Sequence, residues 1–212
     1  MKIDYKLYKP TLDSLTPQQQ ILYNRNIPVE EQSNWLNAYW NNVNDFHLLK
    51  NIKEAAVMIA NYCMLASSKI TILQDCDCDG LTSSAIIANY IHRICSKEPT
   101  ILIHEGKAHG LADIDLDNII ETTNLLIIPD AASNDYEQLK YLHDNGVDIV
   151  IADHHHCEKY SEDAIVVNNQ LDDYPNKDFC GAGVTWQLCR QMDEICNFDY
   201  ANDLVDLCAL GV

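Results

Sequence analysis

The 212-residue sequence has no apolar run long enough to cross a membrane. Spanning a bilayer takes about 20 consecutive apolar residues, and no stretch of this chain approaches that length. The N-terminal residues MKIDYKLYKP also lack the continuous apolar core of a secretion signal. With 47% hydrophobic and 22% charged residues, the composition is that of an ordinary globular protein with one sizeable domain. We therefore expect a soluble cytoplasmic protein with no membrane partner.

Basic residues are scarce. The chain has 14 Lys and Arg residues and 32 Asp and Glu residues, which gives a formal net charge of -18. A surface of this sign repels polyanions, so a nucleic-acid partner would require bound cations or basic surface supplied from elsewhere.

The nine cysteines do not suggest a disulfide scaffold, because the chain has no export signal. Five of them lie in apolar segments with helix-like or strand-like patterns, namely Cys63, Cys95, Cys189, Cys196 and Cys208. Reduced, mostly buried thiols are the expected state.

From residue 69 onward, short apolar segments alternate with segments of helical periodicity. The expected strands are KITILQ, PTILIH, NLLIIP, VDIVIA and AIVVN, and the first of them is followed by the expected helix LTSSAIIANYIHRIC. Short strands that alternate with helices of about ten to fifteen residues are typical of crossover units. The pattern predicts an α/β fold with a mainly parallel sheet of about five strands and helices on both faces.

The residues before the first expected strand are predicted to be helical. Residues 1–44 contain two short amphipathic segments separated by Pro28, which predicts a small helical layer packed on the domain. From residue 45 to about 67, apolar positions recur at steps of three and four, which predicts one longer helix. The expected catalytic domain comprises residues 45–212.

Acidic and imidazole side chains follow three of the expected strands. They are Asp75, Asp77 and Asp79 after KITILQ, Asp130 after NLLIIP, and Asp153, His154, His155 and His156 after VDIVIA. Since the carboxyl ends of parallel strands lie along one edge of a sheet, these segments should converge on one site. Several carboxylates with one or two imidazoles suit Mg²⁺ or Mn²⁺, and more than four such ligands indicate two ions.

Two other metal sites could account for DCDCDG. The segment matches the first half of an EF-hand calcium loop, but Ile86 stands where that loop requires a bidentate Glu. A zinc site could use Cys76 and Cys78 with the histidines, although the spacing is short and no second cysteine pair with zinc-site spacing exists.

Some residues carry more than one interpretation from the sequence alone. The histidines after VDIVIA could be surface residues of a loop, and the role of His109 is open. Gly181 and Gly183 open an expected helix, where they could cradle a phosphate or allow close packing of the helix on the sheet.

The ordered segments DCDCDG, IIPDAASND, IADHHH and FCGAGVTWQL resemble those of the DHH phosphoesterase superfamily, and within it the RecJ-like single-stranded-DNA exonucleases. LYNRNI resembles an Asn-Arg-Gly element, with Asn26 in place of the glycine. HEGKAHGL resembles a Glu-Gly-Tyr-Gly-Leu turn, and LVDLCALGV resembles a Leu-Asp-Leu-Val-Ala-Leu-Gly segment. The resemblance covers nearly the whole chain.

The resemblance implies roles for the residues of these segments. The implied metal ligands are Asp75, Asp77, Asp79, Asp130, Asp153 and His154, with orientation of the imidazoles as the other role open to Asp153. The implied catalytic residues are Asp79, Asp130, His154 and His155, of which His155 would contact the scissile phosphate.

The implied activity is phosphodiester hydrolysis with two Mn²⁺ or Mg²⁺ ions, which removes nucleotides from single-stranded DNA in the 5′ to 3′ direction. The implied partners are single-stranded DNA, single-stranded-DNA-binding protein and other proteins of DNA repair and recombination.

The chain also departs from the family pattern. The family carries a further metal-binding Asp just after the Ala-Leu-Gly segment, and a second domain beyond it, whereas this sequence stops at Val212. We expect the chain to be a fragment of a longer protein, weakly active by itself. A phosphoesterase for short oligonucleotides or cyclic dinucleotides, and a non-catalytic scaffold with the same fold, are the alternative hypotheses.

Overall fold

A computed structural model describes residues 9–37, 42–104 and 109–211. The chain divides into two compact units, residues 1–44 and residues 45–212. We describe each unit by itself, and the expected packing of the first unit on the second stays a prediction. Residues 105–108, in the middle of the HEGKAHGL turn, and Val212 lie outside the described residues.

The described part of the first unit contains two short helices. Helix α1 (Pro17–Asn24) begins with a capping box, in which the Thr16 side chain accepts a hydrogen bond from the Gln19 backbone and the Gln19 side chain accepts one from the Thr16 backbone. Helix α2 (Val29–Leu36) begins directly after Pro28. Between them Asn26 has a φ of 60°, in the left-handed region that glycine adopts most easily. This conformation explains why a glycine suits the corresponding position of the Asn-Arg-Gly element.

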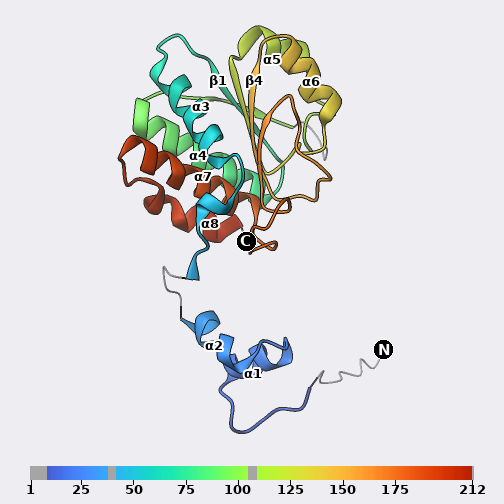
Figure 1. Cartoon of the computed structure of the whole chain (residues 1–212), viewed down its shortest axis with the longest axis vertical. Helices are drawn as coiled ribbons and strands as arrows, with labels where there is room; N and C mark the ends of the chain where they lie inside the picture. The colour runs from blue at the N-terminus through green and yellow to red at the C-terminus, as the bar shows by residue number, and fades with distance from the viewer. Residues whose placement is uncertain (1–8, 38–41, 105–108, 212) are drawn as a thin grey trace. The chain divides into compact units, whose positions relative to one another are not determined.

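The second unit is built on one parallel sheet of five strands (Figure 1). The strands are β1 (Ile70–Gln74), β2 (Thr100–Ile103), β3 (Leu125–Pro129), β4 (Asp148–Asp153) and β5 (Ile165–Asn168). Their order across the sheet is β2-β1-β3-β4-β5, and each neighbouring pair is parallel. The expected fold class is confirmed. Strands β1, β3 and β4, which precede the acidic segments, are direct neighbours.

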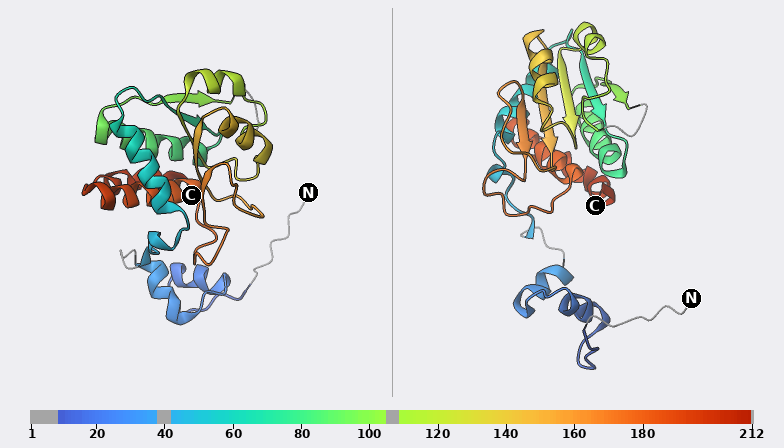
Figure 2. Two further views of the ribbon diagram at one scale, coloured as in Figure 1. Left: turned by 45° about the horizontal axis from the view of Figure 1, so that its top comes forward. Right: turned by 90° about the vertical axis from the view of Figure 1, so that its right-hand side faces the viewer.

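Helices cover both faces of this sheet (Figure 2). Helices α3 (Ile52–Met64), α4 (Cys78–Cys95) and α7 (Gly181–Cys196) pack together on one face, and α8 (Val205–Gly211) lies against α4 and α7. Helices α5 (Leu116–Thr122) and α6 (Tyr136–Asp144) lie on the other face. Strand β3 is buried along its whole length, as a strand covered on both faces should be. Within the described residues, no helix has the length and apolar character needed to span a membrane.

Two helices begin at residues other than those expected. The segment expected as one helix from residue 45 contains a 3-10 turn, η2 (Phe46–Leu48), and α3 begins only at Ile52. The break occurs because Asn51 has a φ of 63°, which an α-helix does not allow. Helix α4 begins earlier than expected, at Cys78, so that Asp79 lies in its first turn. A second 3-10 turn, η3 (Ala201–Leu204), precedes α8.

Candidate active site

The ends of three neighbouring strands bring buried aspartates to one edge of the sheet. Asp75 follows β1, Asp130 follows β3, and Asp153 is the last residue of β4. The three residues are 1%, 1% and 0% exposed. Carboxylates this deeply buried need protons, hydrogen bonds or cations close by, because desolvation of an unpaired charge is costly.

The segment DCDCDG turns sharply from β1 into α4. Asp77 is the N-cap of α4, and its Oδ1 accepts a hydrogen bond from the Gly80 backbone at 2.9 Å. A Cβ atom on Gly80 would lie 2.5 Å from the Cβ of Asp75. The glycine is therefore required for the turn that places Asp75, Asp77 and Asp79 together.

Asp79 is held by the beginning of α7. The backbone nitrogens of Gly181 and Ala182 donate to its two carboxylate oxygens, each at 2.7 Å. A helix N-terminus favours a negative charge at this position. A Cβ atom on Gly181 would lie 2.2 Å from Oδ1 of Asp130. The glycine-rich start of α7 thus allows close packing, and it binds a carboxylate of the protein itself.

Asp130 is buried with one oxygen unsatisfied. Its φ of 71° is in the left-handed region, which is uncommon for a residue other than glycine. Among the described residues, no hydrogen bond reaches its Oδ1, although Nε2 of His154 lies 3.2 Å away. Burial raises the pKa of Asp130 to about 7, and the nearby His154 lowers it only in part. A strained backbone and a buried oxygen without a hydrogen bond are both features expected of a residue that binds a cation.

Asp153 is buried but fully bonded. Its Oδ1 accepts hydrogen bonds from the backbone nitrogens of His154 and His155 at 2.7 and 3.0 Å, and contacts Nδ1 of His155 at 2.8 Å. Its Oδ2 accepts a hydrogen bond from the Ser133 backbone at 3.3 Å. Burial alone would raise the pKa of Asp153, but the bonds from His155 and Ser133 outweigh it and lower the pKa. These contacts shape the loop that carries the two imidazoles.

The two imidazoles face different groups. Nε2 of His154 lies 3.4 Å from Oδ2 of Asp79 as well as 3.2 Å from Asp130, and the contact with Asp130 raises the pKa of His154. His155 is half exposed, and its bond to Asp153 raises its pKa to about 9. His154 therefore lies among the carboxylates, whereas His155 is open to a substrate.

Two groups of potential metal ligands share one residue. The ligand atoms of Asp75, Asp77 and Asp130 lie within 4.8 Å of one another, and so do those of Asp130, His154 and His155. The first group offers three carboxylate oxygens, which suit Mg²⁺ and Mn²⁺, and the second offers one carboxylate oxygen and two imidazole nitrogens. The unsatisfied Oδ1 of Asp130 is the observation that fits a metal ion best.

Asn168 and Ser133, which the sequence did not single out, support the site through hydrogen bonds. Asn168, at the end of β5, is 1% exposed, and its side chain donates to Oγ of Ser133 and to the His155 carbonyl oxygen, each at 3.0 Å. These bonds connect the β5 end to the His155 loop. Asn168 could have been found from its position, because it is a polar residue at the end of a strand, like the aspartates.

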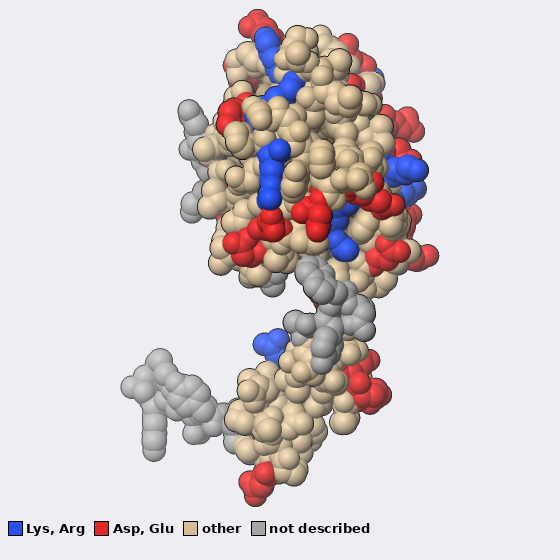
Figure 3. Space-filling view, turned by 90° about the vertical axis from the view of Figure 1, so that its left-hand side faces the viewer, with Lys and Arg blue, Asp and Glu red and all other residues tan. Residues whose placement is uncertain are grey.

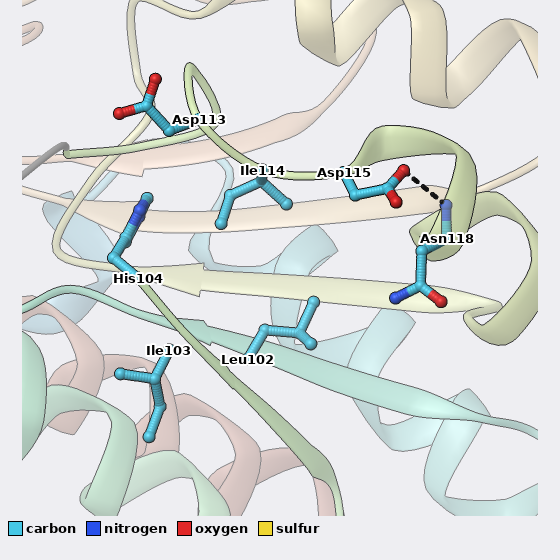
Figure 4. Close-up of a pocket in the computed structure, with 7 residues that line it drawn as sticks. All are labelled: Leu102, Ile103, His104, Asp113, Ile114, Asp115 and Asn118. Carbon is cyan, nitrogen blue, oxygen red and sulfur yellow. Dashed lines mark hydrogen bonds between the residues drawn. The ribbon is translucent and has the colours of Figure 1, made fainter. Parts of the chain in front are cut away.

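Two cavities lie at this edge of the sheet. One of about 270 Å³ is lined by His109, Ser133, Asn134 and His155, among others, and no Lys or Arg is among its described lining residues. A second, of about 600 Å³, lies beside the end of β2 between Leu102, His104 and the 113–118 segment (Figure 4). Nε2 of His104 is buried and without a hydrogen bond among the described residues. Since Gln74 pairs with Ile103, this cavity begins one strand away from Asp75.

Residues 69–212 match the DHH family, N-terminal domain. The chain belongs to the DHH family. The match begins at β1 and includes each of the candidate ligands described above.

Relatives of this DHH protein include exonucleases. The chain is 38% identical over 211 residues to the putative SPbeta prophage-derived single-strand DNA-specific exonuclease YorK of Bacillus subtilis, covering 99% of this chain and 36% of YorK. It is 25% identical to the single-stranded-DNA-specific exonuclease RecJ of Thermus thermophilus, covering 77% of this chain and 24% of RecJ. The chain thus spans about a third or less of the length of these relatives.

Solved structures share the fold. A crystal structure of exonuclease RecJ bound to manganese matches with a TM-score of 0.71 at 24% identity, covering 80% of this chain and 44% of that one. A structure of RecJ from Thermus thermophilus in complex with Mg²⁺ matches with a TM-score of 0.58 at 20% identity, covering 92% of this chain and 24% of that one.

Proposed function

We propose that this DHH protein hydrolyses phosphodiester bonds with two divalent metal ions, Mn²⁺ or Mg²⁺, and that its substrate is single-stranded DNA, degraded in the 5′ to 3′ direction. The observation that carries the proposal is the position of Asp130, whose ligand atom lies within 4.8 Å of those of Asp75 and Asp77 and also of that of His154. One of its oxygens is buried and has no hydrogen bond among the described residues. The relatives named as single-strand DNA-specific exonucleases support the choice of substrate.

The residues divide into ligands and supports. We assign Asp75, Asp77, Asp130 and His154 to the ions. Asp79, whose two oxygens accept hydrogen bonds from the start of α7, is a proposed ligand on the family resemblance alone. Asp153 orients His154 and His155 through its hydrogen bonds, a role that uses both of its oxygens. When bound, the ions would neutralise the phosphodiester oxygens and activate water for in-line attack.

His155 is positioned for the substrate. Its half-exposed ring lines the 270 Å³ cavity, and its pKa of about 9 keeps it protonated near neutral pH. A protonated imidazole in this place donates to a phosphate oxygen and supplies positive charge to a cavity that has no Lys or Arg among its described lining residues.

The surface charge bears on how DNA would bind. In residues 45–212, basic side chains on the face in Figure 3 are scattered among acidic ones rather than gathered in a strip. Some basic side chains of this unit are engaged within the protein, such as that of Arg93, which contacts Asp203 at 2.6 Å. Binding of a long strand would therefore depend on the metal ions and on basic surface contributed from outside this domain.

The test is degradation of single-stranded oligonucleotides labelled at the 5′ or the 3′ end, with Mn²⁺ and with EDTA. With Mn²⁺ we expect the 5′ label to appear first in mononucleotides, while the 3′ label passes through progressively shorter strands. An Asp130→Asn variant purified in the same way controls for contaminating nucleases. Equal degradation by this variant, or absence of degradation by a wild-type protein whose melting temperature rises with Mn²⁺, would contradict the proposal.

The net charge of -18 favours a second candidate, a phosphoesterase for short oligonucleotides or cyclic dinucleotides, because a small substrate meets less repulsion than a long strand. The ratio of kcat/KM for a dinucleotide to that for a 30-nucleotide strand separates the two. A ratio above one would favour the second candidate.

A further inference from the structure

A third group of potential ligands lies beside the first two and differs from them in chemistry. The ligand atoms of Asp75, Cys76 and His109 lie within 4.8 Å of one another. We propose that these three residues bind a thiophilic divalent ion, Zn²⁺ or Co²⁺, at a site that shares Asp75 with the proposed Mg²⁺ or Mn²⁺ site.

The carboxylate and the imidazole are already in contact. Nδ1 of His109 lies 2.6 Å from Oδ2 of Asp75, although the two residues are 34 positions apart in the chain. The backbone nitrogen of Cys76 donates to the other oxygen, Oδ1, at 2.8 Å. Asp75 is therefore fixed with one oxygen directed to His109, and the neighbouring thiol completes the group.

The site is accessible. Asp75 is buried, but Cys76 is exposed and the His109 side chain is 59% exposed. An ion can therefore enter from solvent, and water can occupy a fourth position. Three protein ligands with one open position is a common arrangement for zinc.

The ligand atoms of Asp75, Cys76 and His109 favour a different metal ion from the groups that contain Asp130. One oxygen, one nitrogen and one sulfur suit Zn²⁺ or Co²⁺, whereas Mg²⁺ and Mn²⁺ prefer oxygen. The groups that contain Asp130 have no sulfur. The same edge of the sheet can therefore hold hard ions at Asp130 and a softer ion at Cys76.

The second cysteine of DCDCDG faces away from this group. Sγ of Cys78 donates to the carbonyl oxygen of Leu210 in α8, at 3.3 Å. The zinc site considered from the sequence used Cys76 and Cys78 together, but the structure directs their thiols to different neighbours. Only Cys76 lies with His109, and Cys78 provides a matched control in the same six residues.

The experiment uses Co²⁺ as a spectroscopic probe, because a Co²⁺–thiolate bond gives an intense near-ultraviolet charge-transfer band. Wild-type protein is treated with EDTA, desalted and titrated with Co²⁺ in the absence of thiol reagents. We expect a charge-transfer band that saturates at one equivalent and disappears on addition of Zn²⁺, since thiolates favour Zn²⁺.

Three variants identify the residues that bind the Co²⁺ ion responsible for the band. Cys76→Ser should abolish it, His109→Ala should raise the dissociation constant for Co²⁺ at least about tenfold, and Cys78→Ser should leave it unchanged. Mn²⁺-induced stabilisation, measured in parallel, should persist in all three variants, so this test is independent of the proposed hydrolysis. Absence of the band in the wild type, its persistence in Cys76→Ser, or its equal loss in Cys78→Ser would overturn the proposal.

Discussion

The ends of β3 and β4 carry two aspartates that look alike in the sequence and differ in the structure. Asp130 and Asp153 each follow a run of buried apolar residues, and both are almost fully buried. Asp153 accepts hydrogen bonds at both oxygens, and its pKa is lowered despite its burial. Asp130 has an oxygen with no hydrogen bond among the described residues, and its pKa is raised to about 7 by burial.

The difference arises in the backbone that follows each strand. After β4, the chain turns so that the nitrogens of His154 and His155 face the Asp153 carboxylate. After β3, Asp130 has a left-handed conformation and its own backbone nitrogen donates to the Ala152 carbonyl oxygen, at 2.8 Å. Among the described residues its Oδ1 has no backbone donor and only the contact with Nε2 of His154 at 3.2 Å. A buried carboxylate that is fully bonded stabilises the fold, and one that is not is suited to a cation.

The largest expected effect separates the two aspartates by activity. Asp130→Asn should lower kcat/KM for Mn²⁺-dependent hydrolysis about a thousandfold, because it removes a charge shared by both ligand groups and metal ions contribute several kcal/mol to such reactions. The measurement is hydrolysis of a labelled oligonucleotide.

The same variant should leave the metal-free fold intact. Its free energy of unfolding in EDTA should not fall more than about 1 kcal/mol below that of the wild type, because the variant removes a buried carboxyl whose pKa burial raises. The rise in melting temperature that Mn²⁺ gives the wild type should be absent. A strongly destabilised metal-free variant would mean that Asp130, like Asp153, is a structural residue.

The next largest effect is the loss of stability expected for a variant of Asp153. Asp153→Asn should lower the free energy of unfolding by about 3 kcal/mol, because it weakens charged hydrogen bonds to two backbone nitrogens and to His155 in a buried place. Urea denaturation in EDTA measures it directly. If Asp130→Asn and Asp153→Asn cost the same, the distinction between a metal ligand and a structural carboxylate is wrong.

The sequence was sufficient to predict the sheet and the convergence of its acidic ends. Buried strands such as β3 appear as short apolar runs, and parallel strands must place the residues that follow them at one edge. The family resemblance then named the candidate ligands, and the match of residues 69–212 to the DHH family agrees with it.

The separate roles of Asp130 and Asp153 could not be predicted in this way, because they depend on backbone angles after each strand. The contact of Gly181 with Asp79 joins residues 102 positions apart, and that of His109 with Asp75 joins residues 34 apart. Local patterns carry no signal for such pairs. The late start of α3 likewise depends on the left-handed conformation of Asn51, which the apolar periodicity does not predict.

A smaller effect is expected from the glycine that contacts Asp130. Gly181→Ala would place a Cβ atom 2.2 Å from Oδ1 of Asp130, so the carboxylate must move and Mn²⁺ affinity should fall about tenfold. Gly183→Ala is the matched control in the same helix, because its Cβ would meet the Phe179 ring instead. We expect the control to lose stability and to keep its affinity for Mn²⁺, both measured by thermal denaturation across a Mn²⁺ titration. Equal losses of affinity in the two variants would contradict this account of Asp130.

The smallest effect is that of His155 on the pH dependence of stability in the metal-free protein. The pKa of His155 is raised by Asp153 to about 9, so this pair stabilises the folded state fully below pH 6.5 and loses its contribution as the pH rises towards 9. The loss should be below about 1 kcal/mol, since half of the His155 side chain is exposed and solvent screens the pair.

The raised pKa of Asp130 also makes stability fall as the pH rises, here between about pH 4 and 7, because the folded state prefers the protonated carboxyl. Urea midpoints in EDTA from pH 5 to 9 should therefore fall with pH. His155→Gln should flatten the upper part of this decline and Asp130→Asn the lower part. The contributions of the β3 end and the β4 end would then be separated by the pH range in which each one lowers stability. A decline that neither variant changes would assign the titration to other groups.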